Sequence, residues 1–330
     1  MKLTRRRALS TLGGWGLLPL HAWALAQRHQ LSGAYGEAVF HTQNLQTFVR
    51  QIADRTSGGL EIEVVPNSKL KPMAEVIPAL ERKEIAFGEV LMSAYGAQHP
   101  VLGMDALPFI VRGFEDAARM WDVTRPTVRD YLAARGVRLL YAVPWPPQGL
   151  YSRMPVNKLA DLKGLKFRVY NAATQRLAEL SGAQPVTIAA NNLQKAIEEG
   201  GVDAMLTSST TGVDSQAWKA MKVFVDMRAW IPKNMLCMSE AVWTGLDDAG
   251  RQAIVQASTQ AEANGWRLAR EADDSAKKTL TDHKMEVNLP SVDLRRTLDL
   301  LGERFGREWV GKAGMGHAGA LVDYYTKRNR

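Results

Sequence analysis

The chain has 330 residues, of which 46% are hydrophobic and 23% charged, and its formal net charge is +8. That length exceeds what one hydrophobic core usually serves, so two lobes are expected. Four basic residues and no acidic residue lie in the first 26, so the remaining chain has a net charge of +4. That charge is too small and too widely spread for a nucleic-acid-binding surface. The single cysteine, Cys237, excludes an intramolecular disulfide and a cysteine-held zinc or iron-sulfur site.

Residues 1–26 are typical of an export signal of the twin-arginine type. Paired arginines at Arg5 and Arg6 precede a short apolar stretch and the small-residue site that ends at Ala26. Cleavage after Ala26 and delivery to the periplasm are therefore predicted. The apolar stretch is shorter than the roughly 20 residues that span a bilayer, so no direct membrane insertion is expected.

Strands and helices alternate over the first half of the mature chain. The expected strands cover 29–33, 60–65, 85–91 and 138–143, and the expected helices cover 38–57, 73–82 and 113–135, the last broken near Pro126. Repeated β-α units favour an α/β lobe with a largely parallel sheet.

A second lobe is predicted to start near Pro146. Its expected strands cover 167–170, 184–187 and 202–207, with helices over 174–181 and 192–199. Ligands of such sheets collect beyond the carboxyl ends of the strands. The candidates there are Arg168, Asn171, Thr207, Ser208 and Ser209.

The last third of the chain predicts long helices. Residues 247–283 contain no proline and carry apolar residues at helical intervals. A helix of that length spans roughly 50 Å and is too long for one lobe, so it is expected to brace both. Further helices are expected over 292–309 and 318–330.

Three motifs in fixed order resemble a known family. They are DLKGLKFR at 161–168, GAQPV at 182–186 and GGVDA at 200–204. The chain resembles the solute-binding proteins of tripartite ATP-independent periplasmic (TRAP) transporters, of the DctP-like family, over essentially its whole mature length. The resemblance implies a protein with no enzymatic activity and no cofactor, and with TRAP permease membrane subunits as partners. No metal-ligating residues are expected from the sequence.

The resemblance also implies a fold and an anchor residue. The fold is a two-lobed periplasmic binding protein of type II, with mixed, mostly parallel sheets, a spanning helix and a ligand cleft between the lobes. We expect the first lobe to comprise 27–145 and about 236–270, and the second 146–235 and about 271–330. The family's carboxylate-binding arginine falls on Arg168, whose planar guanidinium can hold both carboxylate oxygens.

Two departures from the family pattern narrow the range of ligands to be expected. Many members carry Gly-Gln-Glu-Asn-Pro where this chain continues from Ala204 to Ser208. The asparagine of that segment assists carboxylate binding, and a hydroxyl of Thr207, Ser208 or Ser209 is expected to replace it here. Many also carry a second arginine where this chain offers Gln148 and Tyr151. A single cationic anchor favours an organic monocarboxylate, whether an aryl, 2-oxo or 2-hydroxy, or sugar acid.

Further candidates for the pocket lie next to the predicted lobe junctions or after strands. Packing in the hydrophobic core is the competing interpretation for each aromatic side chain. The candidates are Trp145, Tyr151, Trp230 and Asn234 near the junctions, and Tyr35, Glu37, Ser93 and Tyr95 after strands of the first lobe.

The sequence gives an enzyme little support. Its histidines lack metal-ligand spacing, no G-x-S-x-G segment occurs, and the phosphate-loop-like run at 306–312 has Ala313 where a magnesium-binding hydroxyl belongs. A periplasmic enzyme acting on the same acid and a ligand-binding partner of a sensor remain as alternatives.

Overall fold

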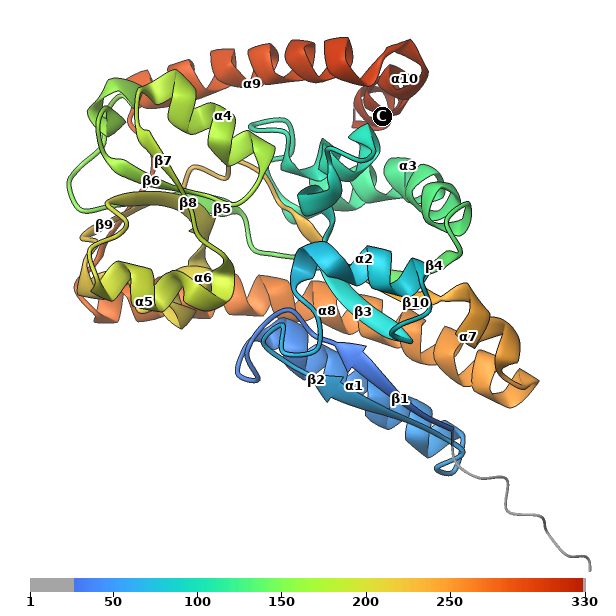
Figure 1. Cartoon of the computed structure of the whole chain (residues 1–330). Helices are drawn as coiled ribbons and strands as arrows, with labels where there is room; N and C mark the ends of the chain where they lie inside the picture. The colour runs from blue at the N-terminus through green and yellow to red at the C-terminus, as the bar shows by residue number, and fades with distance from the viewer. Residues whose placement is uncertain (1–26, 329–330) are drawn as a thin grey trace, which may run out of the picture.

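The computed structural model describes residues 27–328, and two β-sheets organise them (Figure 1). The predicted signal peptide and its cleavage site after Ala26 lie outside the described residues. The first sheet has the order β2-β1-β3-β10-β4 and the second the order β11-β9-β5-β8-β6-β7. Both sheets mix parallel and antiparallel pairs. The expected two-lobed α/β fold is confirmed.

The first sheet combines β1 (Gln27–Ser32), β2 (Leu60–Val65), β3 (Phe87–Leu91), β4 (Val137–Pro144) and β10 (Lys233–Ser239). Helices α1 (Phe40–Arg55), α2 (Met73–Glu81), α3 (Phe114–Ala133) and α7 (Glu240–Gly245) belong to the same lobe. The amphipathic pattern decides how α1 packs, because Leu45, Phe48 and Ile52 share the face that it buries.

The expected break near Pro126 is wrong, because α3 runs through it without interruption. Pro126 and Asp122, whose carbonyl loses its amide partner, are both exposed, so water solvates the free carbonyl. A proline on the solvent side of an amphipathic helix therefore does not end it.

The second sheet combines β5 (Gln148–Ser152), β6 (Lys166–Val169), β7 (Gln184–Thr187), β8 (Ala204–Ser208), β9 (Val223–Val225) and β11 (Glu286–Asn288). Helices α4 (Ala172–Ser181), α5 (Leu193–Glu198) and α6 (Ser209–Asp214) accompany it. Short 3-10 helices cover Met92–Tyr95, Pro100–Ala106, Leu159–Leu162, Ala190–Asn192 and Ala217–Lys219. The strands β5, β9, β10 and β11 were not expected from the sequence. β9 and β11 have only three residues each, and β5 and β10 are buried on both faces, so they lack the polar-apolar alternation of a half-buried strand.

Two crossing segments join the lobes, one between β4 and β5 and one between β9 and β10. They lie side by side, because the amide of Trp145 donates to the carbonyl of Pro232 at 2.8 Å and that of Gln148 to Trp230 at 2.9 Å. The expected lobe boundary near 236 falls inside β10, which pairs with β3 and β4 from Lys233 or Asn234 onward. The second crossing therefore ends before 233.

Helix α8 (Asp248–Asp282) spans both lobes, as the sequence predicts (Figure 1). Asp247 begins it by accepting a hydrogen bond from the Gly250 amide at 2.7 Å. Its first half buries Ile254 and Ala257 in the core of the first lobe, and near its end Leu280 packs in the core of the second. The helix therefore packs against the cores of both lobes and connects them.

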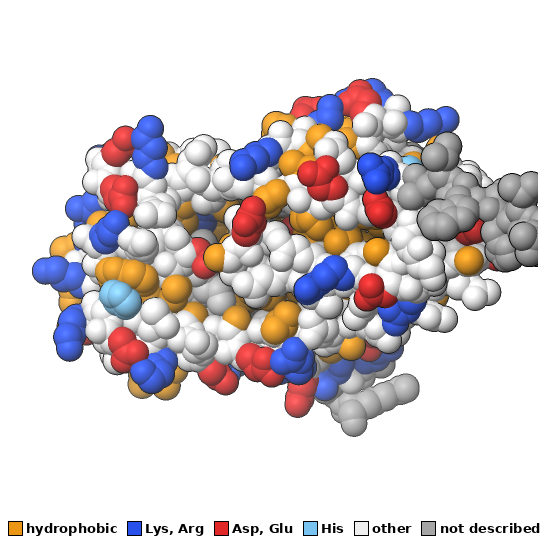
Figure 2. All heavy atoms as spheres, turned by 90° about the horizontal axis from the view of Figure 1, so that it is seen from below, with side chains coloured by type: hydrophobic (Ala, Val, Ile, Leu, Met, Phe, Trp, Pro, Cys, Tyr) orange, Lys and Arg blue, Asp and Glu red, His pale blue; other side chains and the backbone are white. Residues whose placement is uncertain are grey.

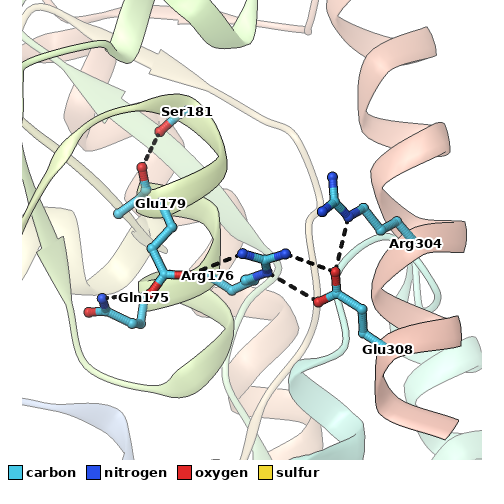
Figure 3. A network of polar contacts seen from close by, with 7 residues as sticks. Gln175, Arg176, Glu179, Ser181, Arg304 and Glu308 are labelled. Carbon is cyan, nitrogen blue, oxygen red and sulfur yellow. Dashed lines mark hydrogen bonds and ion pairs between the residues drawn. The ribbon is translucent and has the colours of Figure 1, made fainter. Parts of the chain in front are cut away.

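Helix α9 (Val292–Ala313) also runs from the second lobe toward the first (Figure 1). The Arg176 guanidinium of α4 holds the carboxylate of Glu308 through hydrogen bonds of 3.1 and 2.9 Å (Figure 3). With Arg304, it lowers the pKa of Glu308 to about 2. The phosphate-loop-like run at 306–312 lies within α9 and not between a strand and a helix, where a phosphate loop belongs.

The last helix, α10 (Met315–Arg328), belongs with the first lobe. Leu321 and Tyr324 share a core cluster with Met120 of α3, and the Tyr324 hydroxyl donates to the Ile110 carbonyl at 3.2 Å. The expectation that 271–330 lies entirely in the second lobe is therefore wrong for α10.

The face seen from below in Figure 2 carries acidic and basic side chains interspersed, with no gathering of one sign. Within residues 27–328, no helix is both long and apolar enough to cross a bilayer.

Candidate functional site

Arg168 lies on β6, the second strand from one edge of the second sheet, where β6 pairs with the edge strand β7 and with β8. Its neighbours Phe167 and Val169 point into the lobe core, which directs Arg168 to the opposite face. Only 3% of Arg168 is exposed, and its Nε donates to the carbonyl of Ile188 at 3.0 Å. The guanidinium lies over the ring of Tyr170, 4.8 Å from its centre.

This guanidinium is buried without a counter-charge. Among the described residues, no carboxylate lies within ion-pair distance of Arg168, and only its Nε is engaged by a protein acceptor. Burial lowers the pKa of Arg168 to about 10, and the nearby Tyr170 and Tyr35 counteract this only in part. A buried cation of this kind is stabilised by an anion that brings two acceptors to its free amino groups.

Tyr170 links Arg168 to the crossing segments. Its hydroxyl donates to Oε1 of Gln148 at 2.9 Å, and Nε2 of Gln148 donates to the carbonyl of Pro146 at 2.9 Å. Burial raises the pKa of Tyr170, so the phenol stays neutral beside Arg168. Trp230, fully buried, packs in the second-lobe core cluster beside Tyr170. The residues that join the lobes thus fix the ring under the arginine.

The first lobe faces this group with a polar and aromatic wall centred on Asn234. Its Oδ1 accepts hydrogen bonds from the indole of Trp145 at 2.9 Å and from the hydroxyl of Tyr35 at 3.3 Å. Its Nδ2 donates to Oε1 of Glu89 at 2.9 Å. Tyr35 also influences the pKa of Arg168, so the wall lies within electrostatic reach of the arginine.

Glu89 and His41 are the residues of this wall that the sequence analysis missed. Only 3% of Glu89 is exposed, and burial raises its pKa to about 7 against the hydrogen bonds from Asn234 and Ala34. His41 packs against Trp145 with ring centres 4.2 Å apart and the rings tilted by 39°, and burial lowers the pKa of His41 to about 3. The sequence does contain one sign of Glu89: it is the single charged residue among the apolar residues and glycine of the strand at 87–91.

A direct contact between the lobes lies beside the site. Nδ2 of Asn171 donates to the Ser93 hydroxyl at 3.4 Å, while its Oδ1 caps α4 at the Thr174 amide. Thr207 is buried on the same sheet face as Arg168, because Met205 pairs with Arg168 and side chains alternate along β8. No protein group in the described part of the chain engages the Thr207 hydroxyl.

Five other candidates are placed in structural roles or at the surface. The hydroxyl of Tyr151 donates to the carbonyls of Ser208 and Ser209 at 3.2 Å. Ser208 caps α6 through the Thr211 amide, and Ser209 donates to Asp273 of α8 at 2.6 Å. Tyr95 donates to the carbonyl of Met73 at 2.6 Å under α2, and Glu37 is exposed ahead of α1. These residues are not gathered around Arg168.

The described residues contain no group of three or more histidine, cysteine, aspartate or glutamate side chains that could hold a metal ion.

One known protein family matches most of the chain. Residues 34–299 match bacterial extracellular solute-binding proteins of family 7, the DctP family. The chain belongs to this family. Its structural neighbours are solute-binding proteins of TRAP transporters, so the resemblance seen in the sequence is confirmed.

The family 7 fold recurs in solved structures over almost the whole chain. Two extracytoplasmic solute receptors of Bordetella pertussis that bind pyroglutamic acid share 36% and 33% identity with it, with TM-scores of 0.88 and 0.89. Each comparison covers 91% of this chain and 100% of the receptor. A marine metagenome TRAP protein with co-purified pyroglutamate shares 29% identity at a TM-score of 0.88, covering 92% of this chain and 99% of that chain.

Among curated relatives, a solute-binding protein of Albidiferax ferrireducens is 24% identical over 286 residues, 82% of this chain and 84% of its own length. The chain is therefore a bacterial extracellular solute-binding protein of family 7.

Proposed function

We propose that this protein captures a small cyclic monocarboxylate, with pyroglutamate as the leading ligand, and delivers it from the periplasm to the membrane subunits of its transporter. The observation that carries the proposal is the buried Arg168 guanidinium, which has two free amino groups and no protein carboxylate beside it. One carboxylate of a ligand satisfies it through a bidentate pair.

The surroundings of Arg168 favour one acidic group on a compact body. Tyr170, Trp145 and Tyr35 supply ring surfaces, and Thr207 supplies a hydroxyl on the same sheet face as the arginine. Among the described residues, Arg168 is the one cation in contact with these rings, so a second carboxylate would lack a cationic partner there, which disfavours dicarboxylates. Pyroglutamate has a single carboxylate on a five-membered cyclic amide, and three relatives with 29 to 36% identity bind it.

Capture then requires that the two lobes close. The Asn171–Ser93 hydrogen bond joins the lobes beside Arg168, and the crossing segments next to Trp145 and Gln148 provide the hinge. A ligand that touches both lobes binds the closed state more tightly and shifts the equilibrium toward it.

Calorimetry on mature protein that has been unfolded and refolded to remove co-purified solutes tests the proposal. We expect pyroglutamate to bind at least about 100-fold more tightly than its methyl ester, since the ester removes the charge-assisted pair of about 3 kcal/mol. Equal binding of acid and ester would exclude Arg168 as a carboxylate anchor. Recovery of unchanged pyroglutamate from the complex is expected of a carrier, whereas chemical turnover would favour the enzyme alternative.

A further inference from the structure

A small cavity lined by buried residues lies inside the first lobe, next to the wall around Asn234. Its polar lining comes from α1, β3, β4 and β10, and the space open to the centre of a water molecule is about 10 Å³. The polar residues that line it are His41, Asn44, Glu89, Tyr141 and Asn234. A cavity of that volume holds about one water molecule.

Two polar atoms of the lining have no protein partner. They are Nε2 of His41 and the hydroxyl of Tyr141, and both are buried from solvent. Other lining groups are engaged: Asn44 donates to the carbonyl of Ala261 at 3.0 Å and accepts from Asn264 at 2.9 Å. A buried polar atom without a hydrogen bond costs roughly 1–3 kcal/mol. Two such atoms, on two residues that line the same cavity, favour a shared hydrogen-bond partner inside it.

The two atoms have complementary hydrogen-bonding character. Burial holds the pKa of His41 at about 3, so its ring is neutral, and Nδ1 lies 3.5 Å from Oε1 of Glu89. A proton on Nδ1 is favoured by that carboxylate, which leaves Nε2 as an acceptor. Burial raises the pKa of Tyr141, so its hydroxyl keeps its proton and can donate. The cavity thus presents one acceptor and one donor.

We propose that an ordered water molecule occupies this cavity, donating to Nε2 of His41 and accepting from the hydroxyl of Tyr141. Water provides both roles at once, and the polar lining distinguishes this cavity from the apolar ones that stay dry. The water fixes the ring of His41, which packs against Trp145. It therefore supports the first-lobe wall of the site from inside, whatever acid the protein carries.

A high-resolution crystal structure of the mature wild-type protein tests directly whether a water molecule occupies the cavity. We expect a density peak within about 3.2 Å of both Nε2 of His41 and the Tyr141 hydroxyl. A featureless cavity would overturn the proposal, and so would a peak that contacts neither atom.

Oxygen-17 relaxation dispersion, which counts long-lived internal waters, provides a second readout. Tyr141→Phe should lose one such water relative to the wild type. Tyr95→Phe is the matched control, because the Tyr95 hydroxyl is already bonded to the Met73 carbonyl and the Ile77 amide, and it should lose none. An unchanged count in Tyr141→Phe, or an equal loss in both variants, would contradict the assignment.

Discussion

The guanidinium of Arg168 and the ring of Tyr170, two residues apart on the same lobe, are stacked with the guanidinium carbon 4.8 Å from the ring centre. The Tyr170 hydroxyl is in turn bonded to Gln148 at the lobe junction. The stack fixes the plane of the guanidinium, and the hydrogen bond fixes the ring. A carboxylate approaching Arg168 therefore meets donors that are already oriented.

The stack predicts different effects for two substitutions of Tyr170. Tyr170→Phe keeps the ring and should weaken ligand binding less than about 5-fold. Tyr170→Leu removes the cation-π contact of about 1–2 kcal/mol as well and should weaken it about 10- to 30-fold. Calorimetric dissociation constants measure both, and equal losses would show that the ring face has no role.

Arg168 should contribute to binding and not to the stability of the unliganded protein. Because its burial is opposed by desolvation and no protein carboxylate offsets it, Arg168→Met should unfold at a urea midpoint equal to or above that of the wild type. The same variant should show no thermal shift with pyroglutamate. The matched control is Arg176→Met, which removes the half-buried pair with Glu308 and should retain the ligand-induced shift.

The amide of Asn234 should be far more important for stability than an exposed one. Asn234→Leu leaves the Trp145 indole and the Glu89 carboxyl without their partner, so we expect a loss of about 2–4 kcal/mol in the free energy of unfolding. Asn264→Leu, at a partly exposed site on α8, should lose less than about 1.5 kcal/mol. Urea denaturation of both variants makes the comparison, and similar losses would refute it.

Glu89 predicts a pH effect on stability. Its pKa in the folded protein, about 7, lies above the ordinary value of 4.5, so between these pH values the folded state binds more protons than the unfolded state. The free energy of unfolding contributed by Glu89 therefore falls as the pH rises through this window, by on the order of 2–3 kcal/mol.

Glu89→Gln removes that titration while preserving the size of the side chain. Urea denaturation at pH 5 and pH 8 should show a smaller loss of stability with rising pH for the variant than for the wild type. The difference between the two proteins cancels the contributions of His41 and Asp105, which titrate in both. Parallel pH profiles would show that Glu89 ionises normally.

Two glycines in long helices should respond to alanine with opposite signs. A Cβ on Gly265 of α8 would lie 2.4 Å from Val143, so Gly265→Ala should destabilise the protein by about 1–3 kcal/mol. Gly311 of α9 has open space around it, and Gly311→Ala should stabilise by about 0.5–1 kcal/mol. Thermal unfolding of the pair tests the close approach of α8 to β4, and a neutral Gly265→Ala would contradict it.

The sequence by itself determined the family, the α/β class, the spanning helix and the position of Arg168. These depend on local patterns: the alternation that faces Phe167 inward and Arg168 outward, the uninterrupted helical spacing of α8, and motifs at fixed separations. Such patterns act within a few residues along the chain, so they can be read without knowing what packs against them.

Only the tertiary structure decided which polar residues meet. Asn234 bridges Glu89, Trp145 and Tyr35, which lie up to 199 residues away along the chain, while the hydroxyls of Ser208 and Ser209 are used by a helix cap and by α8. The course of β10 into the first sheet and the docking of α10 on α3 are likewise long-range pairings. A side chain's hydrogen-bond partner depends on where distant segments pack, and residue type and local spacing do not contain that information.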